Sequence, residues 1–361
     1  MPKIGVLSSG GDCPGINAVI HAVVKKAILD YNLEIVGFLD GFEGLVENKW
    51  RELQYNDVSG IMPLGGTILG TSNKADPFRY PVYREDHLEL LDLSSQAVDN
   101  YRKSGIQALI CIGGDGTFHI ASRLMELGLN VVGVPKTIDN DLNGTDLTFG
   151  FDSAVSIVTE AIDRLHTTAQ SHHRVMVVEV MGRYAGWIAL QGGIAGGGDV
   201  ILIPEIPFKI KQVCDFIQKR IESGKRFSIV VVAEGSRPEG GDLVVQKVVQ
   251  ESHDQIRLGG ISYVVGREIE ELTKLETRVV ILGHLQRGGS PTAFDRVLAS
   301  RFGAKAVELV VEGQFGYFPG LRGEEIIPVP MAQAIDSLKT IPLDSPLLGL
   351  ARSMGTFLGE E

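Results

Sequence analysis

The sequence has little of three features that would each indicate a particular class of protein. It contains only three cysteines among 361 residues, far apart and without a CxxC pair. We therefore expect neither a disulfide framework nor a zinc site, and a reducing cytoplasm fits best. Its apolar runs reach only about five residues, which predicts no membrane span. Basic charge is also scarce, with 34 Lys and Arg against 45 Asp and Glu and a net charge of −11. A broad nucleic-acid-binding face is not expected, and an anionic ligand would need locally clustered arginines.

Glycine, in contrast, is abundant, since the chain has 44 glycines and many directly follow short apolar runs. In an α/β protein this is where a strand turns into a helix, and a turn without side chains lets backbone N–H groups approach a phosphate. The composition, 44% hydrophobic and 22% charged, is that of a folded globular protein. At roughly 150 residues per domain, the length predicts two domains.

Short apolar segments alternate with amphipathic ones along most of the chain. The apolar segments are continuous, which is typical of parallel strands covered on both faces, so we predict a doubly wound α/β fold. Residues 76–104 are expected to form a surface excursion, and the tail after Pro328 a weaker appendage. The predicted strands are residues 4–7, 35–38, 108–112, 131–134, 175–180, 200–203, 228–233 and 279–282. The predicted helices are residues 18–29, 118–127, 154–169, 211–223 and 293–312.

Two glycine-rich turns follow predicted strands and open predicted helices. The first, SSGGDCPGIN, follows residues 4–7, and the second, GGDGT, follows residues 108–112. Either could hold an anion at a helix N-terminus, although a turn that binds nothing would explain the first one by itself. In the second turn, Asp115 is either an N-cap or an oxygen ligand for a magnesium ion that bridges phosphates. Two such turns in one chain favour phosphate binding.

A third turn, PKTIDND, follows the predicted strand at residues 131–134. Its two carboxylates, Asp139 and Asp141, stand two residues apart, and an ordinary Asx turn would explain that spacing. Alternatively, one carboxylate is a general base that takes a proton from an attacking hydroxyl, while Thr137 orients it. The other carboxylate would then hold metal charge or orient the base.

Basic residues gather at the ends of predicted strands. Arg174 and Arg278 precede strands, whereas Arg183 and the segment HLQRGGS follow strands. Each of these alone could be a solvated surface charge. Together they favour a phosphate site at the strand ends, since Arg forks bind phosphate bidentately. Glu234 would then accept hydrogen bonds from sugar hydroxyls, unless it is a plain strand-end carboxylate.

In combination, PKTIDND, MGRYAGW and GHLQRGGSP, together with GGDGT, resemble the motifs of bacterial-type 6-phosphofructokinases. The resemblance extends from Ile4 to about Gly313; GGDGT alone is weak, because NAD kinases and lipid kinases carry a similar turn. It implies two α/β domains with the active site between them, in an allosteric homo-oligomer that is usually a tetramer. The implied donor domain is residues 1–150 plus about 286–336, and the implied fructose 6-phosphate domain is residues 151–285 plus about 337–361.

The resemblance also implies a role for each site residue. Asp139 falls on the catalytic base, with Thr137 and Asp141 as its partners, and Gly11 falls on the turn whose N–H meets the transferring phosphoryl. Further catalytic residues are Lys136 and Arg183, and Asp115 falls on the aspartate associated with Mg²⁺. Contacts to fructose 6-phosphate are implied for Thr137, Ile138, Asp139, Asp141, Met181, Gly182, Arg183, Glu234, His284, Leu285, Gln286 and Arg287. Arg174 and Arg278 fall on arginines lent by a neighbouring subunit. Contacts to ATP are implied for Gly11, Asn73, Lys74, Gly114, Asp115, Gly116 and Thr117.

Some positions depart from the resembled pattern. Asn73 stands where the best-known ATP enzymes have an arginine near the phosphates. Lys136 replaces a usual glycine, as in pyrophosphate-using relatives and some ATP-using ones. Gly116, in contrast, leaves room for a nucleotide where pyrophosphate-specific relatives have an aspartate. The regulatory-site arginines are replaced by His21, Gln54 and His166, while Lys25 and Lys225 keep charge there.

We therefore expect Mg²⁺-assisted phosphoryl transfer from ATP to the 1-hydroxyl of fructose 6-phosphate in a cytoplasmic enzyme. The alternative enzyme uses pyrophosphate as the donor. An NAD kinase would share GGDGT but would not explain the later arginine and histidine motifs. A noncatalytic regulatory subunit of the same fold is disfavoured, because Asp139, Asp115 and Arg183 are all present.

Overall fold

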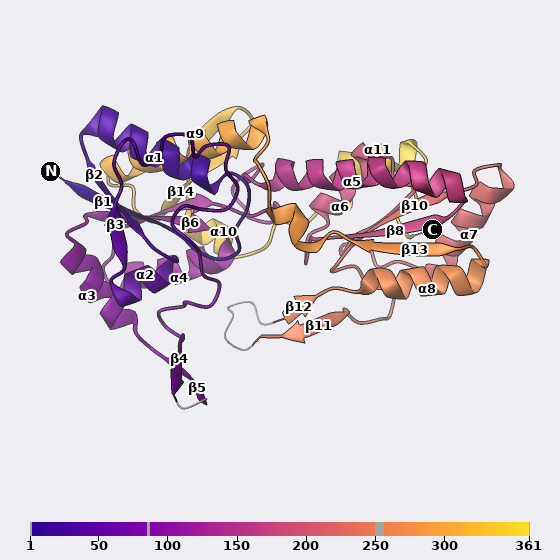
Figure 1. The fold of residues 1–361 in the computed structure, drawn as a ribbon, viewed down its shortest axis with the longest axis horizontal. Coiled ribbons are helices and arrows are strands. Elements are labelled where there is room, and N and C mark those ends of the chain that lie inside the picture. The colour runs from indigo at the N-terminus through magenta and orange to yellow at the C-terminus, as the bar shows by residue number, and fades with distance from the viewer. Residues whose placement is uncertain (1, 85–86, 250–255, 361) are drawn as a thin grey trace.

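The computed structural model describes residues 2–84, 87–249 and 256–360, and it contains two α/β units along its longest axis (Figure 1). The first unit has a five-stranded sheet in the order β3-β2-β1-β6-β7. All its pairs are parallel except that of β3, a short edge strand. Its strands are β1 (Lys3–Ser8), β2 (Glu34–Phe38), β3 (Trp50–Glu52), β6 (Ala108–Gly113) and β7 (Val131–Pro135).

Helices cover both faces of this first sheet. One face packs against α1 (Ile16–Tyr31) and α9 (Ala293–Val311). The other packs against α2 (Phe42–Glu47), α3 (Ser94–Ser104) and α4 (Asp115–Glu126).

The second unit has a four-stranded sheet in the order β13-β8-β10-β9, and all of its pairs are parallel. Its strands are β8 (Val175–Val180), β9 (Val200–Leu202), β10 (Ser228–Ala233) and β13 (Thr277–Ile281). One face packs against α5 (Phe151–His172) and α6 (Trp187–Ala195). The other packs against α7 (Ile210–Glu222) and α8 (Ile261–Thr273). The predicted α/β class with parallel, doubly covered sheets is therefore confirmed.

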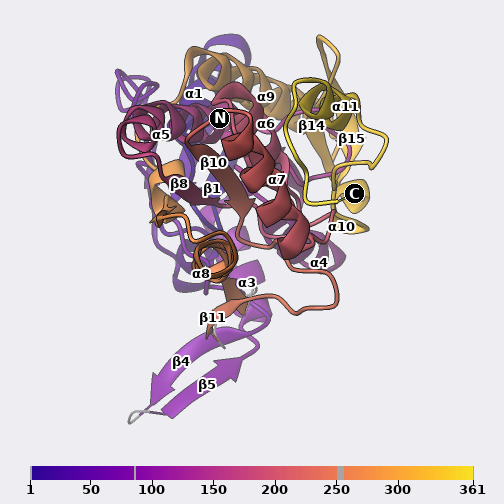
Figure 2. The same cartoon turned by 90° about the vertical axis from the view of Figure 1, so that its right-hand side faces the viewer.

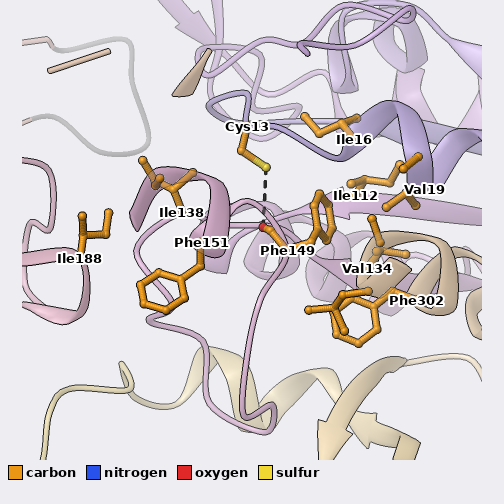
Figure 3. Packing of buried hydrophobic residues seen from close by; sticks show 14 of the residues in the cluster. Cys13, Ile16, Val19, Ile112, Val134, Ile138, Phe149, Phe151, Ile188 and Phe302 are labelled. Carbon is orange, nitrogen blue, oxygen red and sulfur yellow. Dashed lines mark hydrogen bonds between the residues drawn. The ribbon is translucent and has the colours of Figure 1, made fainter. Parts of the chain in front are cut away.

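The apolar strand sequences are explained by burial on both faces. In β8, Val175 and Val177 pack toward α7 and α8, while the alternate residues Met176, Val178 and Val180 pack toward α5 and α6. Successive side chains of a strand point to opposite faces, so apolar residues are needed on both faces. The exception in β8 is Glu179, whose buried carboxylate accepts from the Gly260 and Ser262 N–H groups. The core on the α5 and α6 side also extends into the first unit (Figure 3). One buried cluster thus joins the two units.

Three antiparallel hairpins complete the fold. The hairpin of β4 (Tyr80–Arg84) and β5 (His87–Leu91) projects from the body in both views (Figures 1 and 2). The others are β11 (Val245–Val248) with β12 (Ile256–Leu258), and β14 (Tyr317–Arg322) with β15 (Glu325–Pro330). The predicted excursion at residues 76–104 is correct for β4 and β5 but wrong for α3. That helix covers the first sheet, and its buried Asn100 donates to Leu45 O and Val46 O.

The prediction that the tail after Pro328 is an appendage is wrong. This segment forms α10 (Met331–Ile335) and α11 (Pro346–Ser353), and it buries apolar side chains in the main cores. Ile341, Leu348 and Leu358 are each at most 2% exposed. The bounds predicted for the two domains stay a prediction. No helix in the described part of the chain is long and apolar enough to cross a membrane.

The packing of α1 against α9 requires a glycine at position 303. A Cβ there would lie 2.6 Å from Val19 O, which is backbone and cannot rotate away. We expect Gly303→Ala to lower the free energy of unfolding by about 1–2 kcal/mol, because overpacking outweighs the better helix propensity of alanine. Urea unfolding measures this effect. The matched control is Gly349→Ala in α11, where a Cβ meets nothing within 4 Å, so that variant should be neutral or slightly more stable. Equal stability of the two variants would contradict the expectation.

Candidate active site

The carboxyl ends of β1, β6 and β7, which are neighbours in the first sheet, carry the two glycine-rich turns predicted to bind phosphate and the third turn with its two carboxylates. The turns are joined to one another, because the Lys136 N–H donates to Gly113 O at 2.9 Å. The first turn also receives a side chain from far along the sequence. A Cβ on Gly11 would lie 2.2 Å from a guanidinium nitrogen of Arg287, so the missing side chain leaves the space that this arginine occupies.

The second turn leads directly into α4. Gly114 is the N-cap and Asp115 is the first helical residue, so the N-cap interpretation of Asp115 is wrong. Its carboxylate is exposed, at the helix N-terminus where anions and their metal ions gather. Thr117 is buried, and its side chain occupies the space that a Cβ on Gly113 would need. Gly116 lies between them in the first turn of the helix.

Lys136 connects the third turn to the first. Its ammonium group donates to Gly11 O, and it is only 4% exposed. Burial lowers the pKa of Lys136 to about 8, while the Arg287 charge acts in the same direction and the carboxylates of Asp12 and Asp115 oppose it. A cation therefore lies directly beneath the glycine turn.

The two carboxylates of the third turn lie in the same cluster of charges. The Asp139 N–H donates to Thr137 Oγ1 at 3.1 Å, so this threonine supports the backbone of the turn. Burial raises the pKa of Asp139, against the charges of Arg287 and Arg183. Burial and the neighbouring Asp139 charge raise the pKa of Asp141 to about 7. Within the described residues, Asp139 Oδ1 has no hydrogen-bond partner, which is a costly state for a buried oxygen unless a ligand supplies one.

The carboxyl ends of three strands of the second sheet supply the other half of the site. Met181, Gly182 and Arg183 follow β8, Glu234 follows β10, and the 3₁₀ helix η1 (Gly283–Arg287) follows β13. Gln286 in η1 is fully buried: its Oε1 accepts from the Met181 N–H at 3.3 Å, and its Nε2 donates to Gly283 O at 3.0 Å. It joins two loops of the site.

Electrostatic coupling shows that these two halves meet. Burial raises the pKa of Glu234 to about 8; the Asp139 and Glu179 charges act in the same direction, and Arg287 and Arg183 oppose them. The Arg287 guanidinium also donates to Asp12 O at 3.1 Å. Arg287, from the end of the second sheet, thus lies on the first turn of the first sheet.

Two predicted contacts do not fit as side-chain contacts. Ile138 is 1% exposed and packs in the core (Figure 3), so only its backbone can face a substrate. The Gln286 side chain is equally inaccessible. Both residues were assigned as contacts through the resemblance alone, which does not indicate whether a side chain is buried. His284, Leu285, Asn73 and Lys74, in contrast, are all exposed.

The expectation that all the basic residues gather at one set of strand ends is wrong within a single chain. Arg174 directly precedes β8 and Arg278 is the second residue of β13, so both lie at the amino ends of the strands of the second sheet, whereas Arg183 follows the carboxyl end of β8. Because β8 has six residues at about 3.3 Å per residue, the amino and carboxyl ends of this sheet lie roughly 20 Å apart. Both arginines form ion pairs with Glu276, at 2.8 Å for Arg174 Nε. They cannot serve the site of their own chain.

The residues predicted for regulation also lie apart. Lys25 in α1 lies over the ring of Tyr55, and burial, together with the Lys25 charge, lowers the pKa of His21. His166 belongs to α5 in the second unit, where its Nε2 is 2.8 Å from Gly196 O.

The sequence analysis missed two residues that hold the site together. The Glu205 carboxylate accepts from the Gly186 N–H, in the loop after β8, and from the Ile341 N–H of the tail. The Lys339 ammonium donates to Asn140 Oδ1 in the third turn at 2.9 Å. Both lie outside recognisable motifs, and the signal for Lys339 is only a lone lysine in an otherwise ordinary tail.

The residues present fit a magnesium ion that arrives with phosphates. Mg²⁺ usually takes one or two carboxylates and completes its shell with water and substrate phosphate. Asp115 influences the pKa of both Asp139 and Asp141, so the three carboxylates lie in one region. In the described ranges, no group of three or more His, Cys, Asp or Glu residues could hold a metal by protein ligands alone. The donor set is the one that a phosphate-bridged Mg²⁺ needs.

Comparison with known proteins supports the same interpretation. A family model described as Phosphofructokinase matches residues 3–310. The chain is 53% identical over 360 residues to an ATP-dependent 6-phosphofructokinase of Chloroflexus aurantiacus, covering 99% of this chain and 98% of that protein. It is 49% identical over 358 residues to a pyrophosphate–fructose 6-phosphate 1-phosphotransferase of Streptomyces coelicolor, covering 99% and 100%.

Solved structures share the fold. A phosphofructokinase of Pichia pastoris superposes with a TM-score of 0.80 at 32% identity, covering 98% of this chain. The chain spans only 36% of that much longer protein. A pyrophosphate-dependent phosphofructokinase of Nitrosospira multiformis has a TM-score of 0.81 at 21% identity over 99% of this chain, which concerns the fold alone. With the whole-chain relatives and the family model in agreement, the resemblance found in the motifs is confirmed, and the chain belongs to the phosphofructokinase family.

Proposed function

We propose that this chain transfers the γ-phosphoryl group of ATP to the 1-hydroxyl of fructose 6-phosphate, giving fructose 1,6-bisphosphate and ADP in glycolysis. The observation that carries the proposal is Asp139. Its unpartnered oxygen lies where the turns of the first sheet meet the arginines of the second. Relatives named as ATP-dependent 6-phosphofructokinases over the whole chain support the same activity.

Asp139 acts as the general base of the reaction. Its raised pKa makes it a stronger base than an ordinary aspartate, and Arg183 and Arg287 keep it from being protonated too readily. It takes the proton of the 1-hydroxyl as the hydroxyl oxygen bonds to the γ-phosphorus. The bond from that phosphorus to the bridging oxygen breaks, and ADP leaves. Thr137 fixes the turn through the Asp139 N–H.

The glycine turn and the cations beside it stabilise the charge on the transferring group. The Gly11 turn presents backbone N–H groups, and Lys136 and Arg287 supply positive charge directly beneath and beside it. Gly114, Gly116 and Thr117 at the start of α4 provide the helix N-terminus for the donor phosphates, with Asn73 and Lys74 nearby in the site that we assign to ATP. Asp115 would hold Mg²⁺, which would neutralise phosphate charge.

The acceptor lies on the second unit. Met181, Gly182 and Arg183, together with His284, Leu285 and Arg287, would bind the sugar phosphate, and Glu234 would accept from a sugar hydroxyl. Ile138 contributes backbone only, and Gln286 positions Met181. Arg174 and Arg278 lie at the amino ends of the strands of the second sheet, where they pair with Glu276. From there they would reach the 6-phosphate bound to a neighbouring subunit. The active form would then be a homo-oligomer, and we propose a tetramer.

Pyrophosphate remains the second candidate donor. The observation that favours it is Lys136, whose ammonium group lies against the Gly11 turn where a smaller donor would also bind. Relatives named for each donor are almost equally identical to this chain. Gly116 favours ATP over pyrophosphate as the donor, because it carries no side chain that would obstruct or repel the α-phosphate.

Replacing the proposed base should abolish the chemistry without removing binding. In Asp139→Asn an amide of nearly the same shape cannot take the hydroxyl proton, so we expect kcat to fall about 10²- to 10⁴-fold. Initial rates at saturating fructose 6-phosphate and MgATP measure it. As a control, the melting temperature should stay within a few degrees of that of the wild type. A kcat near the wild-type value would contradict the assignment.

Activity should depend on residues from two chains. We expect Arg278→Ala and Asp139→Asn homo-oligomers to be weakly active, and mixed oligomers to regain activity because some sites then combine intact halves. The measurement is the specific activity after the two variants are dissociated and reassembled together. Each variant reassembled with itself is the control. No gain after proven subunit exchange would show that both residues act within one chain.

Two substitutions should separate the donors. Gly116→Asp should raise the KM for ATP sharply, because the new carboxylate repels the donor phosphates. The KM for fructose 6-phosphate should not change. Lys136→Ala should lower kcat more than it raises the KM for ATP, because its charge acts on the transferring group. Steady-state rates with ATP and with pyrophosphate measure both effects. A wild-type enzyme that used pyrophosphate readily and ATP poorly would promote the second candidate.

A further inference from the structure

The tail segment between α10 and α11 crosses the molecule between the two halves of the active site. We call residues 336–341 the tail strap. Leu338 forms an antiparallel bridge with Leu142, and the Lys339 N–H donates to Asp141 O at 2.8 Å. Asn143 Nδ2 donates to Ser337 O at 2.6 Å. The strap is thus paired with the turn that carries Asp139 and Asp141.

The side chain of Lys339 fixes the conformation of that turn. Its ammonium group donates to Asn140 Oδ1 and Thr145 O, both at 2.9 Å, and to Asp146 O at 2.8 Å. An ammonium group has three donors, so all of them are used, one in the turn and two in the segment that follows it. Asn140, directly after Asp139, has a φ of +52°, a left-handed conformation that needs support in a residue other than glycine.

The other side of the tail strap contacts the loop after β8, which carries the residues that we assign to acceptor binding. Lys339 O accepts from the indole N–H of Trp187 at 2.9 Å, and the Lys339 ammonium lies 5.7 Å from the centre of that ring. Two residues on, the Ile341 N–H donates to Glu205 Oε1, and the same carboxylate accepts from the Gly186 N–H. Gly186 and Trp187 end the loop that begins with Met181, Gly182 and Arg183.

From these contacts we propose that Lys339 is a positioning residue of the reaction. It holds the turn that carries Asp139 in the correct position relative to the loop after β8, where the acceptor would bind. The proposal rests on the proposed function, because the position of Asp139 affects catalysis only if Asp139 is the general base. Lys339 touches no reacting atom and lies beyond residues 3–310, which the family model matches. Its charge also interacts with the charges of Asp146 and Asp141.

Removing the ammonium group should misplace the base while leaving the substrate sites in place. We expect Lys339→Met to lower kcat about ten- to hundredfold, since a displacement of about 1 Å has effects of this size. The KM for fructose 6-phosphate should change less than about threefold. Lys339→Arg, which keeps the charge and several donors, should restore most of kcat. If Lys339→Met is not recovered folded, Lys339→Gln, with two donors and no charge, tests the same split between kcat and KM.

The matched control is Asn143→Ala, which loosens the same strap at Ser337 without touching Asn140 or Trp187. It should lower the melting temperature about as much as the lysine variants while keeping kcat. Either a normal kcat in Lys339→Met or equal losses of kcat in Lys339→Met and Asn143→Ala would overturn the proposal, the latter because the role would then be structural only. A wild-type protein unable to phosphorylate fructose 6-phosphate would instead refute the proposed function.

Discussion

The carboxylate of Asp139 lies among Arg183, Arg287 and Lys136, and one of its oxygens lacks a hydrogen-bond partner in the described part of the chain. A buried charge in this state is costly, and nearby cations make it tolerable. The cations come from both α/β units, so the base has its properties only while the units stay together. The shared core around Phe149 and Phe151 keeps them together.

Three polar side chains, Gln286 within a motif and Glu205 and Lys339 outside the motifs, connect loops of the site. Gln286, Glu205 and Lys339 each join two segments that are distant in the sequence. A single such hydrogen bond contributes only about 1 kcal/mol to stability, so stability is not their main effect. Their effect is on geometry, because each allows only one arrangement of the loops that it joins. The tail is therefore connected both to the turn that carries Asp139 and to the loop after β8.

The predicted strands and the five predicted helices all correspond to observed elements, because continuous apolar runs are diagnostic when a sheet is buried on both faces. The predicted helices do not include α2, α3, α6, α8, α10 or α11. In α6, two glycines in an apolar sequence hide the helix, and they are needed because their Cβ atoms would collide with Val158 and Ile201. The tail was misjudged because Ile341, Leu348 and Leu358 are isolated apolar residues in sequence and become core only through their partners.

The sequence by itself determined the fold class, the positions of the three turns and the family, because these depend on local patterns: apolar runs, glycines at strand ends and short motifs. Only the tertiary structure decided which motif residues act together. The side chains of Ile138 and Gln286 are buried away from the surface of the site. Arg174 and Arg278 lie at the amino ends of their strands, away from Arg183. The tertiary structure also brought Lys339 to the turn of the base. The physical reason is that burial and electrostatic coupling depend on distances between segments hundreds of residues apart, which no local pattern records.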